Sequence, residues 1–187
     1  MLNYHSPINK NKSYSGLTIK EVSPIMKLNL RGKNRDFLST IGKNINMILP
    51  IEANTSSSSD KYTSLWLSPD EWMIVTNKTI DYENNEYEIE NILYNKISKS
   101  NLGAVTDVSD QFVLINLNGE KVFDLLSTGS PFNFSHFRTK KGVVVQTLLN
   151  QIDIIIHHKE INDINLFVRR SFSEHLMSWI DDAASRL

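Results

Sequence analysis

An internal repeat is the feature that most restricts how this chain can fold. Residues 28–32 read Leu-Asn-Leu-Arg-Gly, and a similar Ile-Asn-Leu-Asn-Gly follows 87 positions later at 115–119. Phe-Leu-Ser-Thr at 37–40 is matched 88 positions later by Leu-Leu-Ser-Thr at 125–128. In both copies a strand pattern ends at a glycine, and a helix pattern follows it. The agreement in order and spacing predicts two related halves.

Two further matches extend the repeat. Residues 65–75 contain two strand patterns around the turn sequence Ser-Pro-Asp-Glu, and they align with 148–158 at an offset of 83 positions. The helix pattern at 89–97 aligns with residues 171–187. Each half is then expected to run β-α-β-β-α, with an apolar sheet face that needs cover. We therefore expect an internally duplicated α+β fold in which the halves superpose and pack together.

The length of 187 residues suits one domain. We expect a single duplicated domain over 25–187, with its halves at about 25–100 and 104–187. Residues 1–24 show little periodicity and are expected to form an N-terminal arm, with a short extended piece at 17–22. The four serines at 56–59 are expected in a solvated loop, because serine competes with backbone pairing and buries little apolar surface.

The last helix carries an apparent start signal. The sequence Ser-Phe-Ser-Glu at 171–174 fits a capping box, in which Ser171 and Glu174 each satisfy a backbone amide of the other. We expect Ser171 to cap this helix and its replacement by alanine to cost about 1 kcal/mol. The apolar residues expected to be buried along the helix are Phe172, Leu176, Ile180, Ala183 and Leu187.

The charge composition argues against a polyanionic partner. The chain has 20 basic and 21 acidic residues and a formal net charge of −1. Binding to nucleic acid or to a membrane surface through clustered positive charge is therefore not expected. No apolar run approaches the roughly 18 residues of a membrane helix, and the N-terminus lacks the apolar core of a secretory signal. The absence of cysteine fits a reducing compartment, so we expect a cytoplasmic protein.

The sequence lacks the motifs that mark common catalytic and cofactor sites. Its seven glycines never form a dinucleotide-binding or phosphate-binding loop. His157 and His158 are adjacent in a predicted strand and point to opposite faces, so they cannot hold one metal together. No nucleophile-elbow pattern supports a serine triad. We expect no catalytic, cofactor-binding or metal-binding residue on this chain.

Polar residues at two places are candidate anchors for a partner or for the fold itself. Asp107, Ser109 and Asp110 precede a strand of the second half, where they either close an Asx-type turn or offer a polar handle to a ligand or partner. Arg169, Arg170 and Ser171 follow the last predicted strand, where the arginines either form structural salt bridges or contact another subunit. The acidic pairs at 70–71 and 181–182 are expected at a turn and on an exposed helix face.

Six segments in consistent order resemble the gamma subunit of heterotetrameric sarcosine oxidase. Residues 65–75 resemble its L-W-L-G-P-D-E-W-L-L, and 106–110 resemble its V-D-V-S-D. Residues 117–133 resemble its L-x-G, L-L and G-C-P-L-D elements, and 146–149 match its Q-T-L-L. Residues 167–176 resemble its V-R-R-S-F-A-x-Y-L, and 179–184 resemble its W-L-x-D-A-A. The match runs from about Leu28 to the C-terminus.

This resemblance implies a fold like the folate-binding domain of the glycine-cleavage T protein. It also implies a role in an oxidoreductase complex that demethylates sarcosine to glycine, with hydrogen peroxide and 5,10-methylenetetrahydrofolate as further products. In the family the cofactors belong to other subunits: FAD and FMN to beta and its boundary with alpha, NAD and tetrahydrofolate to alpha, and zinc to delta. The gamma subunit carries none and docks on alpha, so this chain is expected not to be catalytic by itself.

The sequence departs from the family pattern at three positions. Asn133 replaces an acidic residue, Ser130 replaces cysteine, and Ser68 replaces glycine at the hairpin turn. These changes affect the expected interface in detail. Two alternatives stay open: a free-standing folate-binding protein of the same fold, and the equivalent subunit of another complex that oxidises N-methyl amino acids.

Overall fold

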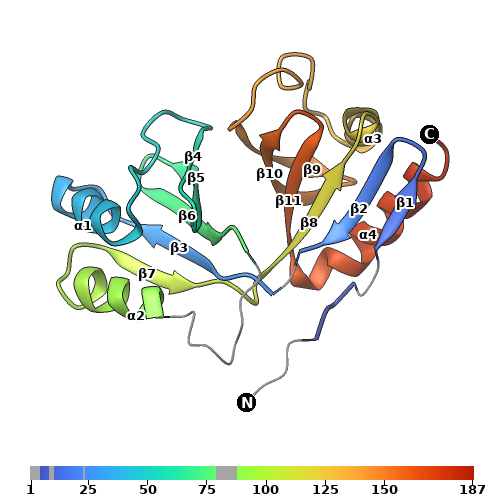
Figure 1. Cartoon of the computed structure of the whole chain (residues 1–187). Coiled ribbons are helices and arrows are strands. Elements are labelled where there is room, and N and C mark those ends of the chain that lie inside the picture. Colours follow the sequence, from blue (N-terminus) through green and yellow to red (C-terminus); the bar gives the residue numbers. More distant parts are fainter. Residues whose placement is uncertain (1–4, 9–10, 23, 79–87) are drawn as a thin grey trace. The chain divides into compact units, whose positions relative to one another are not determined.

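The computed structural model describes residues 5–8, 11–22, 24–78 and 88–187 (Figure 1). The chain divides into two compact units. Unit 1 consists of Met1–Ser23 and Gln111–Leu187, and unit 2 is Pro24–Asp110. This division differs from the expected halves at about 25–100 and 104–187, because the N-terminal segment belongs to the same unit as the C-terminal half.

Among its described residues, unit 2 contains one antiparallel sheet and two helices. The strands are β3 (Lys27–Arg31), β4 (Ser56–Ser58), β5 (Tyr62–Ser68), β6 (Glu71–Thr76) and β7 (Ala104–Asp107). The helices are α1 (Arg35–Ile45) and α2 (Glu88–Leu93), and α2 continues as a short π-helix, η2 (Tyr94–Ser98). The strand order across the sheet is β4-β5-β6-β3-β7. The predicted hairpin around Pro69 and Asp70 is confirmed as β5 and β6.

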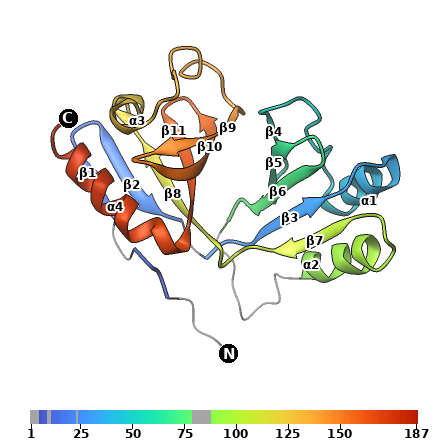
Figure 2. The same ribbon diagram turned by 180° about the vertical axis from the view of Figure 1, so that it is seen from behind.

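Both helices of unit 2 lie on one face of its sheet (Figure 1 and Figure 2). Leu28 and Leu30 point to the helices, while Asn29 between them points to the opposite face. Three α1 residues at helical spacing complete this side of the core, namely Phe37, Ile41 and Ile45. The alternation within β3 and the four-residue spacing within α1 therefore build one apolar layer.

Unit 1 contains a six-stranded antiparallel sheet and two helices among its described residues. The strands are β1 (Lys12–Tyr14), β2 (Leu17–Glu21), β8 (Phe112–Asn118), β9 (Val144–Leu149), β10 (Ile152–Glu160) and β11 (Asp163–Arg169). The helices are α3 (Val122–Gly129) and α4 (Arg170–Ala184). The strand order is β1-β2-β8-β11-β10-β9. Both helices pack on one face, against residues such as Ile115 and Leu166.

The structure corrects the expectation of a separate arm over residues 1–24. β2 pairs with β8 from Thr18 opposite Asn118 to Glu21 opposite Ile115. Leu17 and Ile19 alternate into the core of unit 1 and are almost fully buried. β2 therefore satisfies the backbone groups along one side of β8, which would otherwise be an open sheet edge.

The expected α+β duplication is confirmed, and each unit has one strand more between its helices than predicted. β3 and β8, α1 and α3, and α2 and α4 hold equivalent positions, and the sheets share the order β4-β5-β6-β3-β7 and β9-β10-β11-β8-β2. The last strand of each order comes from a different place in the chain. β7 follows α2 in unit 2, whereas β2 precedes β8 in unit 1.

The predicted match of 65–75 with 148–158 is wrong. Leu28 pairs with Ile74 in β6, and its counterpart Ile115 pairs with Leu166 in β11. The hairpin of β5 and β6 therefore corresponds to β10 and β11, not to β9 and β10. The serine segment expected as a loop forms the edge strand β4, which pairs with β5 in a register that places Ser56 opposite Leu65.

The start of the last helix also differs from its prediction. α4 begins at Arg170, and Arg169 in the N-cap position provides no side-chain cap. Ser171 is exposed, while Ser173 is buried and its hydroxyl donates to the Arg170 carbonyl at 2.8 Å. Phe172 and Leu187 are 49% and 41% exposed, so they are outside the buried stripe. The buried α4 residues are Ser173, Leu176, Met177, Ile180 and Ala184.

We predict that the cap that matters lies on α1 and not on α4. The Asn34 side chain accepts a hydrogen bond from the Phe37 amide at 2.6 Å. Asn34→Ala should lower the free energy of unfolding by about 1 kcal/mol, because it removes this acceptor. Ser171→Ala should change it by less than about 0.5 kcal/mol. Urea unfolding of both variants checks this, and equal losses would contradict the assignment.

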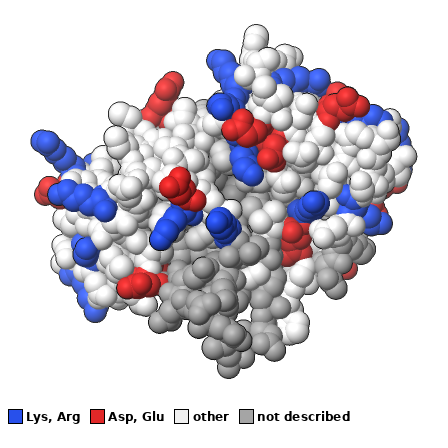
Figure 3. Space-filling model, in the orientation of Figure 1, with Lys and Arg blue, Asp and Glu red and all other residues white. Residues whose placement is uncertain are grey.

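Acidic and basic side chains are interspersed on the face drawn in Figure 3, as the nearly balanced composition predicts. No helix among the described residues is both long and apolar enough to span a bilayer.

Candidate functional site

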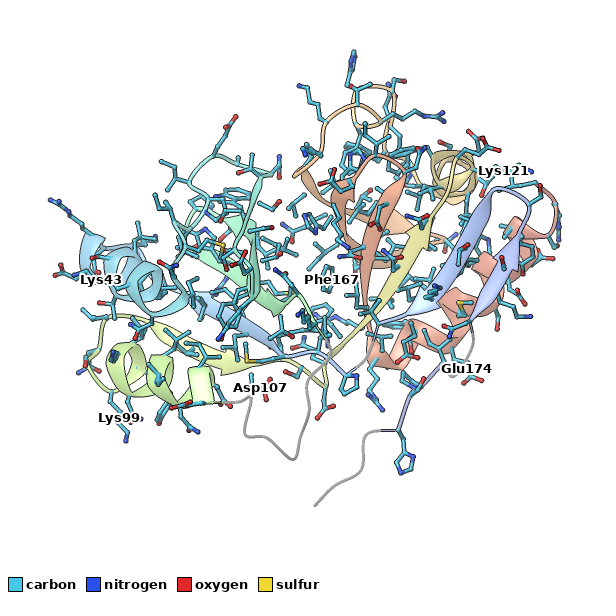
Figure 4. The ribbon with its side chains drawn as sticks, viewed as in Figure 1. Lys43, Lys99, Asp107, Lys121, Phe167 and Glu174 are labelled. Atoms are coloured by element: carbon cyan, nitrogen blue, oxygen red, sulfur yellow. The ribbon has the colours of Figure 1, made fainter. Side chains whose placement is uncertain are left out.

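The acidic segment before β8 forms the predicted Asx-type turn. Asp107 is the last residue of β7, and its side chain accepts a hydrogen bond from the Ser109 amide at 2.8 Å. Asp107, which is labelled in Figure 4, is exposed like Asp110, whereas Ser109 is buried. The structure thus brings Asp107 and Ser109 together, with Ser109 as part of the fold and the two carboxylates at the surface of unit 2.

A buried lysine explains why Ser109 points inward. The Ser109 hydroxyl accepts a hydrogen bond from the Lys27 backbone amide at 2.9 Å. The Ser109 carbonyl accepts a second one from the Lys27 ammonium, also at 2.9 Å. The ammonium also donates to the Ile25 carbonyl at 3.2 Å. Sequence reasoning missed Lys27, because lysine is almost never fully buried unless its charge is paired.

Asp107 also affects a carboxylate on the neighbouring helix. The pKa of Glu90 in α2 is raised, first by partial burial and then by the negative charge of Asp107. The negative charge of Asp107 therefore acts on the Glu90 side chain at this end of unit 2.

Arg169 and its neighbours lie at the end of β11 in unit 1. Arg169 is exposed, pairs with Phe112 across the strands, and borders a hollow of about 350 Å³. The remaining lining residues are Gln146, Thr147, Leu148, Asp153, Ile154 and Ile155. The Arg170 guanidinium donates to the His5 carbonyl at 2.5 Å, and its amide donates to the Gln111 carbonyl at 2.8 Å. Arg170 therefore helps to fix the N-terminal segment within unit 1.

Sequence reasoning missed a polar pair that both units repeat. Asn29 donates to Glu71 at 2.7 Å in unit 2, and Asn116 donates to Asp163 at 2.5 Å in unit 1. The register of the strands makes the two asparagines equivalent and the two carboxylates equivalent. Each pair lies on the sheet face opposite the helices. The asparagine between two aliphatic residues in both repeat copies was the signal that could have predicted it.

The other oxygen of the Glu71 carboxylate, Oε2, pairs with a cation. The Arg31 guanidinium donates to Glu71 at 2.7 Å, and this hydrogen bond is the main reason that the pKa of Arg31 is raised. Arg31 is largely exposed, so the pair contributes little to stability. The arrangement orients the Glu71 carboxylate between Asn29 and Arg31.

The two adjacent histidines point to opposite faces of β10, as predicted. His158 is buried toward α3 and stacks on Phe137 with ring centroids 5.0 Å apart, and its Nδ1 lies 2.6 Å from the Lys140 carbonyl. His157 is buried on the other face. Residues 5–8, 11–22, 24–78 and 88–187 contain no group of three or more His, Cys, Asp or Glu that could hold a metal ion.

We predict that His157 makes the protein sensitive to acid. Burial, with the nearby His158 and Lys159, lowers the pKa of His157 to about 4. In the unfolded chain His157 has an ordinary histidine pKa near 6.5. Between about pH 6.5 and 4 the unfolded chain therefore binds more protons than the folded chain, so the free energy of unfolding decreases as the pH is lowered through that range. The free energy of unfolding at pH 5.5 should lie about 1.4 kcal/mol below its value at pH 7.5.

The His157→Gln variant isolates this contribution. Its free energy of unfolding should depend less on pH between 7.5 and 5.5 than that of the wild type, whatever its absolute stability. His175→Gln, at an exposed position of α4, is the matched control and should keep the wild-type pH dependence. Identical pH dependence in all three proteins would contradict the assignment.

Comparison with known protein families matches residues 31–186 to the sarcosine oxidase gamma subunit family. The chain belongs to this family. The matched region includes most of unit 2, most of the C-terminal part of unit 1, and all six candidate anchors, Asp107, Ser109, Asp110, Arg169, Arg170 and Ser171. A comparison with curated protein sequences finds no match.

Two solved structures share the fold of this chain. A chain of heterotetrameric sarcosine oxidase from Corynebacterium sp. U-96, in complex with pyrrole 2-carboxylate, matches with a TM-score of 0.80 and 21% identity, over 91% of this chain and 84% of that one. The glycine cleavage system aminomethyltransferase T from Bartonella henselae matches with a TM-score of 0.64 and 13% identity. That match covers 88% of this chain and 45% of the other, and it confirms the predicted T-protein-like fold.

Proposed function

We propose that this chain is a non-catalytic gamma subunit of a sarcosine oxidase complex. The family match over residues 31–186 carries the proposal. The same fold in a chain of a heterotetrameric sarcosine oxidase supports it. In this role the chain binds the alpha subunit directly and meets beta and delta in the assembled complex.

The reaction proposed for the complex is the oxidative demethylation of sarcosine. Sarcosine loses two electrons that reduce dioxygen to hydrogen peroxide, and its methyl carbon passes to tetrahydrofolate, so the products are glycine, hydrogen peroxide and 5,10-methylenetetrahydrofolate. Removing electrons from an N-methyl amine requires a cofactor that accepts them, and a protein must bind and orient that cofactor. The proposal assigns FAD, FMN, NAD, tetrahydrofolate and zinc to the partner subunits and none to this chain. The lack of glycine-rich loops and of cysteine in the sequence supports that assignment.

The exposed candidate anchors provide the polar part of the proposed subunit contact. Asp107 and Asp110 offer carboxylates on unit 2, and Arg169 offers a guanidinium at the edge of a hollow on unit 1. Ser109 acts inside the fold, by holding Lys27 and the turn. Charged groups at a subunit interface mainly set orientation and specificity, while apolar contacts supply most of the affinity.

The isolated chain provides the first test. Purified without partners, it should be colourless and should release no hydrogen peroxide from sarcosine. A titration with tetrahydrofolate, followed calorimetrically, should give no binding heat. Stoichiometric flavin or turnover by the chain alone would contradict the non-catalytic role, and saturable binding of tetrahydrofolate would favour a free-standing folate-binding protein.

A further inference from the structure

Helix α1 of unit 2 has an outer face that borders an open hollow of about 640 Å³. The α1 residues on this face recur at helical spacing and are Arg35, Leu38, Ser39, Gly42 and Lys43, followed by Asn46 just after the helix. Phe37, Ile41 and Ile45 on the opposite face are buried in the core. The small residues Ser39 and Gly42 lie in the middle of the outer face and leave room above the helix.

The loop after α1 forms the other wall of the hollow and displays two isoleucines. Ile48 is 86% exposed and Ile51 is 80% exposed, whereas Leu49 and Pro50 between them are buried. Met47 and Leu38, both partly buried, extend the apolar lining. Single exposed apolar residues are common on protein surfaces, but a contiguous group beside a hollow marks an interaction site.

Hydrogen bonds hold this loop in place. The Met47 amide donates to the Gly42 carbonyl at 3.1 Å, and the Ser57 hydroxyl donates to the Ile48 carbonyl at 2.7 Å. The buried Trp72 indole donates to the Pro50 carbonyl at 2.7 Å. The two isoleucines are therefore presented on a fixed backbone, which lowers the entropy lost when a partner binds.

Two cations flank the hollow along α1. Arg35 and Lys43 are eight residues apart, which corresponds to about 12 Å along a helix. The lining includes no acidic residue, and within the described part of the chain neither cation forms a salt bridge. Arg35 is the first residue of α1, where the helix dipole disfavours a positive charge. Its charge therefore does not serve the helix itself.

We propose that this hollow, defined by α1 and residues 46–51, is a docking site for a segment of a partner subunit. The segment presents apolar side chains to Ile48 and Ile51 and carboxylates to Arg35 and Lys43. An apolar groove between a helix and a fixed loop suits an amphipathic segment, and the charges complement an acidic one. This inference rests on the proposed function, because it assumes that the chain has a large subunit to bind.

Charge substitution of the two isoleucines tests the apolar part. The variant Ile48→Asp/Ile51→Asp and the large subunit of the complex, alpha, are purified separately. Their affinity is then measured by titration of one protein with the other. Binding should weaken at least about 30-fold, which is the size expected for central interface residues. Ile161→Asp is the matched control, because Ile161 is 68% exposed but lies on the turn between β10 and β11. It should bind as the wild type does.

Neutralising the two cations tests the charge part. Arg35→Gln/Lys43→Gln should slow association and reduce its dependence on salt concentration, because long-range attraction to carboxylates is lost. Lys61→Gln/Lys140→Gln removes two exposed cations elsewhere and should leave both quantities unchanged. Thermal unfolding of each free variant should stay close to that of the wild type, since every altered residue is exposed.

The outcomes separate this inference from the proposed function. If the wild type binds the large subunit and Ile48→Asp/Ile51→Asp binds equally well, the docking site is wrong while the proposed function stands. If the wild type does not bind the large subunit, the proposed function itself fails. If light scattering shows that the wild type alone is a dimer and the isoleucine variant a monomer, a second copy of the chain occupies the hollow and the inference is overturned.

Discussion

Replacing Phe37 by alanine should lower the free energy of unfolding by about 3–5 kcal/mol. Phe37 is fully buried in the core of unit 2, and its ring centroid lies 5.9 Å from that of Trp72. The ring fills space next to two glycines: a Cβ atom added at Gly32 or Gly103 would meet it within 3 Å. Alanine would leave a cavity that the close backbone around it cannot readily fill.

Phe172→Ala is the matched control for this prediction. Phe172 was expected in the buried stripe of the last helix, but 49% of its surface is exposed. Its replacement should therefore cost much less, about 1 kcal/mol or below. Urea unfolding followed by circular dichroism measures both variants. Equal losses would mean that Phe37 is not the centre of the packing in unit 2.

Replacing Gly119 by valine should destabilise unit 1 by about 4 kcal/mol. Gly119 has a φ of 134°, which costs a residue with a side chain about 1–3 kcal/mol. An added Cβ would lie 2.2 Å from the Gly16 carbonyl oxygen, and relieving that contact costs about 1–3 kcal/mol more. The carbonyl cannot withdraw freely, because it accepts a hydrogen bond from the Lys121 amide at 3.1 Å.

Gly16→Ala separates the two contributions. Gly16 has a φ of 77°, but the atoms nearest to a Cβ there belong to the flexible side chains of Glu120 and Lys121, at 3.0 Å or more. Its cost should be that of the backbone conformation alone, about 1–2 kcal/mol. Thermal unfolding of both variants provides the comparison. A Gly119→Val loss no larger than that of Gly16→Ala would contradict the close contact between the β1–β2 turn and Gly119.

The duplication could be predicted from sequence where both copies use apolar side chains in the same pattern. Leu28 and Leu30 alternate around Asn29 just as Ile115 and Leu117 alternate around Asn116, and these strands proved equivalent. The later match failed because several strand-turn-strand segments have similar alternation. The pairing that distinguishes them depends on backbone hydrogen bonds between distant residues, which the local pattern does not contain.

Elements with few apolar residues were also hard to predict, because their pairing with distant strands is not contained in the local sequence pattern. β4 consists of three serines and is held by its pairing to β5, so its composition indicates a loop. The extended piece predicted at 17–22 is confirmed as β2, but its place in the sheet was not predicted, because its partner β8 is about a hundred residues away in sequence. In α4 the small residue Ser173 takes the buried position that the apolar pattern assigned to Phe172.

The candidate site was predictable only in part. The turn at Asp107 and Ser109 follows from local side-chain chemistry, and it formed as expected. The burial of Lys27 could not be anticipated, since its ammonium is held by the carbonyls of Ile25 and Ser109, a partner 82 positions away. The hollow beside α1 was missed in the sequence. Ile48 and Ile51 are exposed because Leu49 and Pro50 between them are buried, and that burial depends on tertiary packing of the loop.

Co-purification with the alpha subunit tests the central claim most directly. The chain is expressed with an affinity tag together with the alpha, beta and delta subunits, and the eluted proteins are quantified by their masses and flavin absorbance. The proposed function predicts a stable complex that contains one copy of this chain per alpha subunit and oxidises sarcosine. Recovery of the tagged chain alone, beside an active complex assembled without it, would contradict that role.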